Sequence, residues 1–147
     1  MHIFSRSIGF FLLICTLTAS GQTPPEKKPP TAEQQELLKE AEKWSDETAK
    51  LRKEGKLEAA IAAAEKMLAA EVKLYGELHD DPIGSLGQIA ECREQLEQFA
   101  EAKIVREQIL ALQTKRFGTD DWRVMDARLA TEHIELLRKL TQRLSEK

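Results

Sequence analysis

Two segments of the chain align with each other without a gap: GKLEAAIAAAEKMLAAEVKLYG at residues 55–76, and EQFAEAKIVREQILALQTKRFG at residues 97–118. Their closing glycines, Gly76 and Gly118, lie 42 residues apart (118 − 76 = 42). The same spacing separates Leu57 from Phe99, Ala60 from Ala102, Leu68 from Leu110, and Tyr75 from Phe117. Self-similarity at one fixed period of this size is typical of a solenoid of paired helices.

Hydrophobic residues and turn signals around these segments predict five helices. In residues 57–75 the hydrophobic side chains recur at three- and four-residue steps, which places them on one face of a helix. The stretches 76–82 and 118–121 combine a glycine, which ends a helix, with aspartates that cap the next one. Softer breaks fall at Gly55 and near Glu97. We expect helices at residues 33–54, 57–75, 82–96, 99–117 and 122–145.

The composition agrees with an all-α chain. Charged residues make up 32% and aromatic residues 5% of the 147 residues, and strong helix formers dominate. Such a composition with helical periodicity is typical of a helical bundle, a coiled coil or a helical repeat. The formal net charge of −3 argues against nucleic acid as the main partner, because nucleic-acid-binding domains usually carry a basic patch.

The N-terminus has the order of features found in a cleaved secretory signal. Arg6 precedes an apolar run at residues 8–17, and Ala19-Ser20-Gly21 supplies small residues for cleavage. The run is too short to span a bilayer. A lipoprotein signal at Cys15 is the alternative, although Ile14 is bulky beside that cleavage point. We expect a signal peptide at 1–21, a proline-rich linker at 22–32 and a helical domain at 33–147, with export to the periplasm or the extracellular space.

No constellation of residues in the sequence points to catalysis, to a cofactor or to a metal ion. His79-Asp80-Asp81 has no second His or Cys at ligand spacing, so it is better explained as a capping loop. His133 lacks the second His of a zinc-protease helix. Cys92 is the one cysteine left after signal cleavage, and we expect it to be buried. The sequence therefore predicts a protein that is not an enzyme.

Several motifs resemble the tetratricopeptide repeat (TPR), in the 42-residue form found in kinesin light chains. Residues 74–82, LYGELHDDP, resemble the loop of that repeat, and Ile89-Ala90 resembles the Leu-Ala of its next helix. Signature positions are matched by Trp44, Leu51, Gly55 and Ala60 in the first unit and by Leu86, Ile89, Ala90 and Ala102 in the second. Leu129-Ala130 resembles the start of a third unit, with a connection two residues shorter. Glu47, Arg93 and Glu97 depart from the pattern. The resemblance implies about two and a half repeats of antiparallel helix pairs over nearly all of residues 33–147.

The same resemblance implies a concave binding wall formed by the first helix of each pair. Carried over to this sequence, its residues are Ser45, Ala49, Arg52 and Lys53 in the first unit, Gly84, Gly87, Gln88, Glu91 and Glu94 in the second, and Thr131, Ile134 and Glu135 in the third. Gln88 falls where the family often has an Asn that could hold a peptide backbone. The wall would bind a protein or a peptide.

Two functions follow from these features, and the sequence leaves both open. The first is an exported scaffold that binds a protein or peptide partner on its concave face. The second is a structural or assembly protein that self-associates through its last helix, where Leu137, Leu140 and Leu144 have no following helix to cover them. A homodimer, or a longer natural chain, would cover that stripe.

Overall fold

A computed structural model describes residues 29–146 of the chain, and within them it is all-α, with five helices and no strand. The helices are α1 (Ala32–Lys53), α2 (Leu57–Tyr75), α3 (Asp80–Gln95), α4 (Phe99–Phe117) and α5 (Trp122–Ser145). The five predicted helices are confirmed, each to within two residues at either end. The predicted signal peptide and the first part of the linker lie outside the described residues.

Local side-chain chemistry explains why three of the helices begin where they do. Thr31 and Gln34 form a capping box at the start of α1. His79 caps α3 by accepting a hydrogen bond from the backbone N–H of Asp81, and Asp121 caps α5 by accepting one from Arg123. Each acceptor satisfies one of the N–H groups that have no partner inside the helix.

The backbone features of the helix ends recur at a spacing of 42 residues. Gly76 ends α2 at φ 80° and Gly118 ends α4 at φ 81°. The left-handed residue after α1 is Gly55 at φ 71°, and the one after α3 is Glu97 at φ 57°. The capping residues His79 and Asp121 share the spacing as well. A given position in α3 therefore corresponds to the position 42 residues later in α5.

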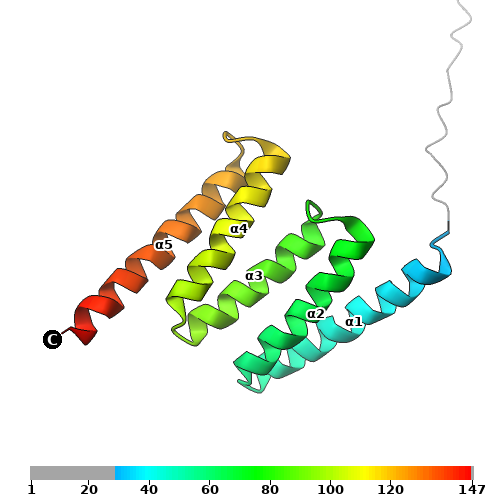
Figure 1. The fold of residues 1–147 in the computed structure, drawn as a ribbon, viewed down its shortest axis with the longest axis horizontal. Helices are drawn as coiled ribbons and strands as arrows, with labels where there is room; N and C mark the ends of the chain where they lie inside the picture. The colour runs from blue at the N-terminus through cyan, green and yellow to red at the C-terminus, as the bar shows by residue number, and fades with distance from the viewer. Residues whose placement is uncertain (1–28, 147) are drawn as a thin grey trace, which may run out of the picture.

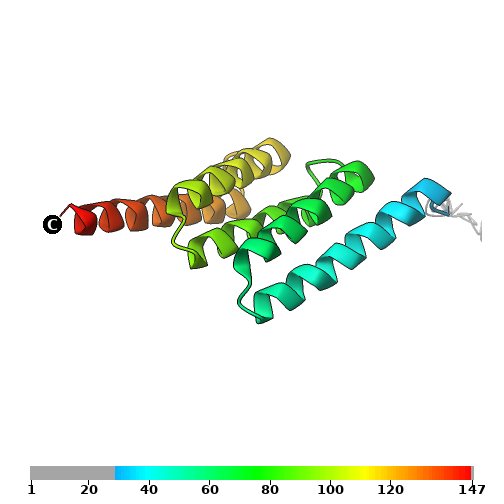
Figure 2. The same ribbon diagram turned by 60° about the horizontal axis from the view of Figure 1, so that its bottom comes forward.

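The helices form an ordered row in which each one packs mainly on its neighbours in the sequence: α1 on α2, α2 on α3, α3 on α4, and α4 on α5. Figures 1 and 2 show two layers, with α2 and α4 on one side and α1, α3 and α5 on the other. The C-terminal end of α5 extends beyond α4 (Figure 1). Each terminal helix thus has one packed side, whereas α3 is packed from two directions.

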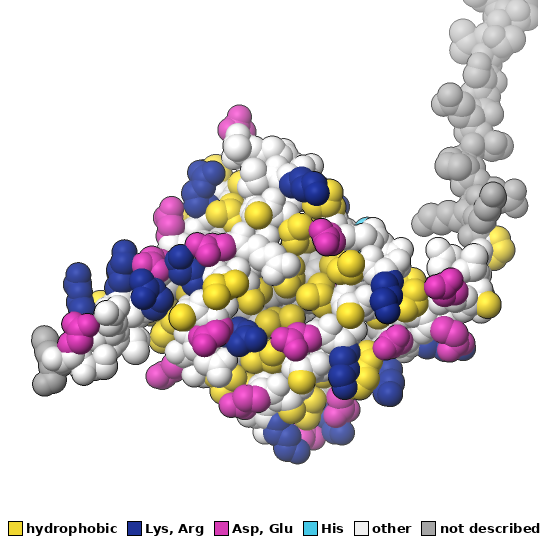
Figure 3. Space-filling model, viewed as in Figure 1, with side chains coloured by type: hydrophobic (Ala, Val, Ile, Leu, Met, Phe, Trp, Pro, Cys, Tyr) yellow, Lys and Arg dark blue, Asp and Glu magenta, His cyan; other side chains and the backbone are white. Residues whose placement is uncertain are grey.

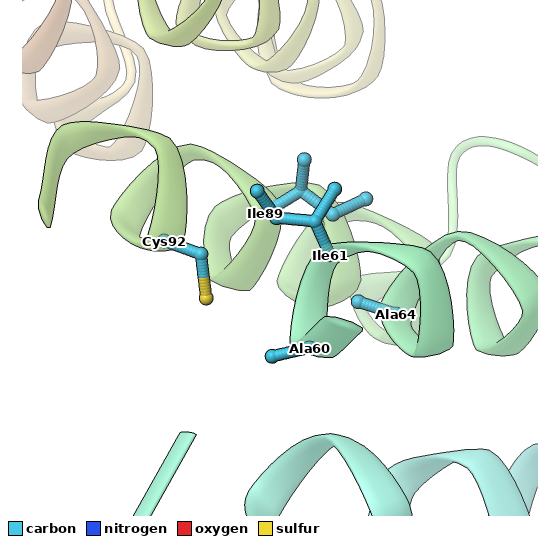
Figure 4. Close-up of a cluster of buried hydrophobic side chains, with 5 residues drawn as sticks. All are labelled: Ala60, Ile61, Ala64, Ile89 and Cys92. Atoms are coloured by element: carbon cyan, nitrogen blue, oxygen red, sulfur yellow. The ribbon is translucent and has the colours of Figure 1, made fainter. Parts of the chain in front are cut away.

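The core consists of two hydrophobic clusters along this row. The first joins Ala60, Ile61 and Ala64 of α2 to Ile89 and Cys92 of α3, and in Figure 4 the Ile61 and Ile89 side chains meet. The second joins α3, α4 and α5 through Ile83, Leu86, Ile109 and Ala127. Partly buried Leu68 and Val105 contact both clusters, so the two parts of the core are continuous.

Small residues lie where the helices approach closely. Ala60, Ala90 and Ala102 each have an exposed fraction of 0%. Full burial of such a small side chain fits a close approach of helices, since a larger side chain would force the helices apart. No helix in the described part of the chain is both long and apolar enough to cross a membrane.

Enlarging one of these alanines tests the packing directly. We expect Ala102→Leu to lower the free energy of unfolding by about 1–3 kcal/mol, because the extra methyl groups overpack the crossing. Ala100→Leu is the matched control, since Ala100 lies on the same helix and is exposed. Urea denaturation of both variants decides the matter, and equal stability of the two would contradict the assigned crossing.

Candidate binding face

The exposed surface of α3 is a narrow strip that faces away from α2 and α4. Asp81, Gly84, Glu91 and Gln95 are exposed along it, and Gly87 and Gln88 are half-buried. The other sides of α3 are covered because both α2 and α4 pack against it. We call the side of the row formed by α1, α3 and α5, with this strip at its centre, the odd-helix face. It lies on the far side of the molecule in Figure 1.

Two glycines on this strip have no role in packing. A Cβ atom added to Gly84 or to Gly87 would have no heavy atom within 4 Å, and neither residue has a positive φ. Glycine inside a helix destabilises it by about 0.5–1 kcal/mol relative to alanine. Both glycines therefore cost stability without making room for any part of this chain, and they leave bare backbone at the centre of the odd-helix face.

Three of the charged residues predicted to contact a partner form ion pairs within the chain. Arg52 of α1 donates to the Glu91 carboxylate of α3 at 2.7 Å, and Arg106 of α4 donates to Glu94 at 2.8 Å. Glu91 is exposed, whereas the Glu94 and Arg106 side chains are mostly covered. Lys53 is exposed and Gln88 is half-buried. The charges of the face therefore largely neutralise one another, and they also tie neighbouring helices together.

The structure places Ile134 in the core, with an exposed fraction of 1%. The TPR resemblance aligns Ala130 with Ala90, which are 40 residues apart (130 − 90 = 40), and so places Ile134 at the position of Glu94. The helix caps repeat after 42 residues, which shifts the correspondence by two positions. In the register of the caps, Ile134 corresponds to Cys92, which is also fully buried (134 − 42 = 92). The prediction that Ile134 faces a partner is corrected accordingly.

The cap register identifies other α5 residues that correspond to the strip on α3. Leu129 corresponds to Gly87 and His133 to Glu91, both on the strip, and Leu136 corresponds to Glu94, which lies beside it. All three are exposed. The TPR resemblance did not place them on the face, although the equal spacing from Gly76 to His79 and from Gly118 to Asp121 indicates this register.

These leucines belong to a longer apolar stripe on α5. The exposed fraction is 61% for Leu129, 55% for Leu136, 45% for Leu140 and 74% for Leu144. Leu137, which was predicted to mediate self-association, is half-buried. We call the four exposed leucines the α5 stripe. Arg128 and Glu132 occupy the positions equivalent to buried Leu86 and Ala90, so the outer surface of α5 does not reproduce the surface of α3 that packs on other helices.

The loop residues His79, Asp80 and Asp81 have structural roles. Asp80 accepts two hydrogen bonds from Arg116, at 2.6 and 3.1 Å, and these hold the pKa of its carboxyl below the usual range. In the equivalent loop, hydrogen bonds from Arg123 lower the pKa of Asp121 to about 2. No group of three or more His, Cys, Asp or Glu side chains in residues 29–146 is placed to hold a metal ion. Both loops thus cap helices and connect neighbouring ones.

Cys92 has an exposed fraction of 0%, which confirms the expectation that it is buried. Burial raises the pKa of its thiol above the ordinary value, so the side chain stays protonated at neutral pH. A protonated, enclosed thiol is a poor nucleophile. Cys92 therefore acts as a small apolar core residue (Figure 4).

The opposite side of the row, formed by α2 and α4, carries apolar side chains in its middle and charged ones around them (Figure 3). The exposed apolar residues of α2 and α4 are mainly alanines, such as Ala62, Ala69 and Ala111, with Ile104 and Tyr75 as the large ones. Exposed alanine is explained by its high helix propensity. This side therefore offers fewer features that could recognise a partner than the odd-helix face does.

A charge exchange tests whether the Arg52–Glu91 pair stabilises the fold. We expect Arg52→Glu alone to lower the free energy of unfolding by roughly 0.2–1 kcal/mol, since the pair is partly exposed. The double variant Arg52→Glu, Glu91→Arg should recover most of that loss because it keeps the ion pair with its polarity reversed. Urea denaturation of the double-mutant cycle measures the effect, and a double variant less stable than the single one would exclude the pairing.

Comparison with protein-family models, with curated proteins and with solved structures finds no match to this chain. Its function must therefore be argued from its own residues.

Proposed function

We propose that this chain is an exported, non-enzymatic helical-repeat scaffold that binds a protein or peptide segment on the odd-helix face. The resemblance of its sequence to the TPR supports a solenoid, as does the recurrence of helix ends every 42 residues. Export is supported by the order of basic, apolar and small residues in positions 1–21.

The observation that carries the proposal is the bare strip on α3. Gly84 and Gly87 weaken the helix, and nothing in the chain approaches them. Glycine allows a ligand or another backbone to approach the main chain closely. A segment laid across α3 would meet bare backbone there and the half-buried amide of Gln88 beside it.

The neighbouring helices add different chemistry on either side of the strip. On the α1 side the face offers the Arg52–Glu91 ion pair and exposed Lys53. On the α5 side it offers apolar Leu129 and Leu136. A partner segment that fits this arrangement has polar groups toward α1 and apolar side chains toward α5, with a slender backbone between them.

Selection of displayed random peptides on the purified protein tests the proposal. We expect the enriched peptides to bind Gly87→Leu at least about tenfold more weakly than the wild type, because the new side chain fills the strip. The melting temperature should not fall, since a Cβ at position 87 meets no atom and leucine favours the helix by up to about 1 kcal/mol.

Ala62→Leu is the matched control, because it adds a similar side chain at an exposed position of α2 on the opposite side. Peptides should bind this variant like the wild type. Equal binding to both variants would place the peptide elsewhere on the molecule. Failure to enrich any peptide would count against a peptide-binding scaffold altogether.

The alternative function, self-association through α5, is favoured by the α5 stripe. Four exposed leucines on one helix form a larger apolar patch than an isolated surface leucine would, and such patches usually mark an interface. Both Leu140 and Leu144, which were predicted to mediate self-association, belong to the stripe. Half-buried Leu137 also contributes to packing within the chain.

Sedimentation of the wild type and of Leu136→Glu, Leu140→Glu tests this alternative. A homodimer should become a monomer when both charges are introduced, while the circular dichroism spectrum stays helical because neither side chain is buried. A wild type that is monomeric at roughly tens of micromolar would exclude self-association of useful strength.

A further inference from the structure

A hollow lies between α4 and α5 at the edge of the odd-helix face. Arg106, Ile109 and Gln113 of α4 line it, and α5 contributes Trp122 and Ala127. Arg123 lines it as well, and its remaining α5 residues are Asp126 and Ala130. These two correspond to Gly84 and Gln88 of the strip in the register of the helix caps. The hollow is therefore a continuation of the proposed binding face toward α4.

The side-chain amide of Gln113 is incompletely satisfied in this hollow. Its Oε1 atom is buried and has no hydrogen-bond partner. A buried carbonyl oxygen without a partner costs free energy, so such an atom in a folded protein calls for an explanation. Gln113 is also one of the residues that line the open hollow, so a molecule that enters the hollow contacts this side chain.

The equivalent position in the preceding pair of helices is satisfied. Gln113 corresponds to Glu71, and Ala127 corresponds to Ser85 (113 − 71 = 42 and 127 − 85 = 42). The Ser85 hydroxyl donates a hydrogen bond to the Glu71 carboxylate. In the second pair, alanine replaces the serine, so the hydroxyl donor is absent. The hollow with its unpaired acceptor thus depends on two residues in which the pairs differ.

The replacement of Glu71 by Gln113 also changes what the position can recognise. A carboxylate only accepts hydrogen bonds, whereas an amide side chain both accepts and donates. A peptide group likewise has one N–H donor and one carbonyl acceptor. Trp122, with an exposed fraction of 70%, contributes a large ring to the same hollow. The combination fits a peptide group carried next to an apolar side chain.

We propose that this hollow anchors the bound segment, which donates a backbone N–H to Gln113 Oε1 and places an apolar side chain against Trp122 and Ile109. The inference rests on the proposed function and assigns its strongest contact to α4 and α5. Arg106 and Arg123 line the same hollow, and both are already paired within the chain, with Glu94 and Asp121 respectively. The ligand class is an uncharged peptide segment with an apolar residue.

Titration of the ¹⁵N-labelled protein with N-acetyl-leucine methylamide tests the anchor. This probe carries two peptide groups and one apolar side chain. We expect saturable shifts of the Gln113 side-chain amide and of the Trp122 indole N–H in the wild type. In Ala127→Ser the new hydroxyl should donate a hydrogen bond to Gln113 Oε1, as the Ser85 hydroxyl does to Glu71. This should weaken probe binding about tenfold. The melting temperature of that variant should rise, which shows that it folds.

The double variant Gln113→Glu, Ala127→Ser transplants the complete Glu71–Ser85 pair and should abolish the shifts. Gln108→Glu is a matched control, because Gln108 is exposed on the same helix and does not line the hollow. Equal affinity of the wild type and Ala127→Ser would overturn the proposal. So would the absence of shifts at Gln113 and Trp122, which would leave the oxygen to an ordered water molecule.

The displayed peptides distinguish a failure of the anchor from a failure of the proposed function. Peptides that depend on Gly87 but bind Ala127→Ser like the wild type would support the face and overturn the anchor. Probe binding in the hollow without any enriched peptide would support the anchor site and overturn the peptide scaffold.

Discussion

The close approach of neighbouring helices at fully enclosed alanines is the constraint on which the rest of the structure depends. Ala60, Ala90 and Ala102 allow α2, α3 and α4 to pack at short distances, and larger residues such as Ile61 and Ile89 fill the space beside them. Because each helix is held by its sequence neighbours, the direction of every crossing propagates along the row. The positions of the exposed strips are consequently set by the core.

The residues of α3 fall into two groups: those that pack against α2 and α4, and those on the exposed strip. Two helices cover it, so the remaining strip is narrow, and the glycines there reduce it to backbone. On α5 the corresponding strip is apolar, and on α1 its neighbour is an arginine already paired with Glu91. A single face therefore combines bare backbone, a satisfied ion pair and leucines, and the proposed peptide binding rests on this combination.

The sequence was sufficient for the helices and insufficient for the face. Glycines, caps and hydrophobic spacing determine helix ends through local interactions, so α2, α4 and α5 were predicted with their observed bounds. The Arg52–Glu91 pair joins residues 39 positions apart and depends on how α1 lies beside α3. Ile134 was misplaced because a matched alanine was given more weight than the caps. The unpaired oxygen of Gln113 became visible only once α4 and α5 were packed together.

Packing between sequence neighbours also determines how the molecule comes apart. Closing any of these contacts requires only a short loop of chain, so the entropic cost of folding is incurred in small steps, and folding of such local topologies is fast. Since α5 is held mainly by α4, it can detach while α1, α2 and α3 remain assembled. Amide hydrogen exchange should consequently be graded along the row, with the slowest exchange in α3 and the fastest at the free end of α5.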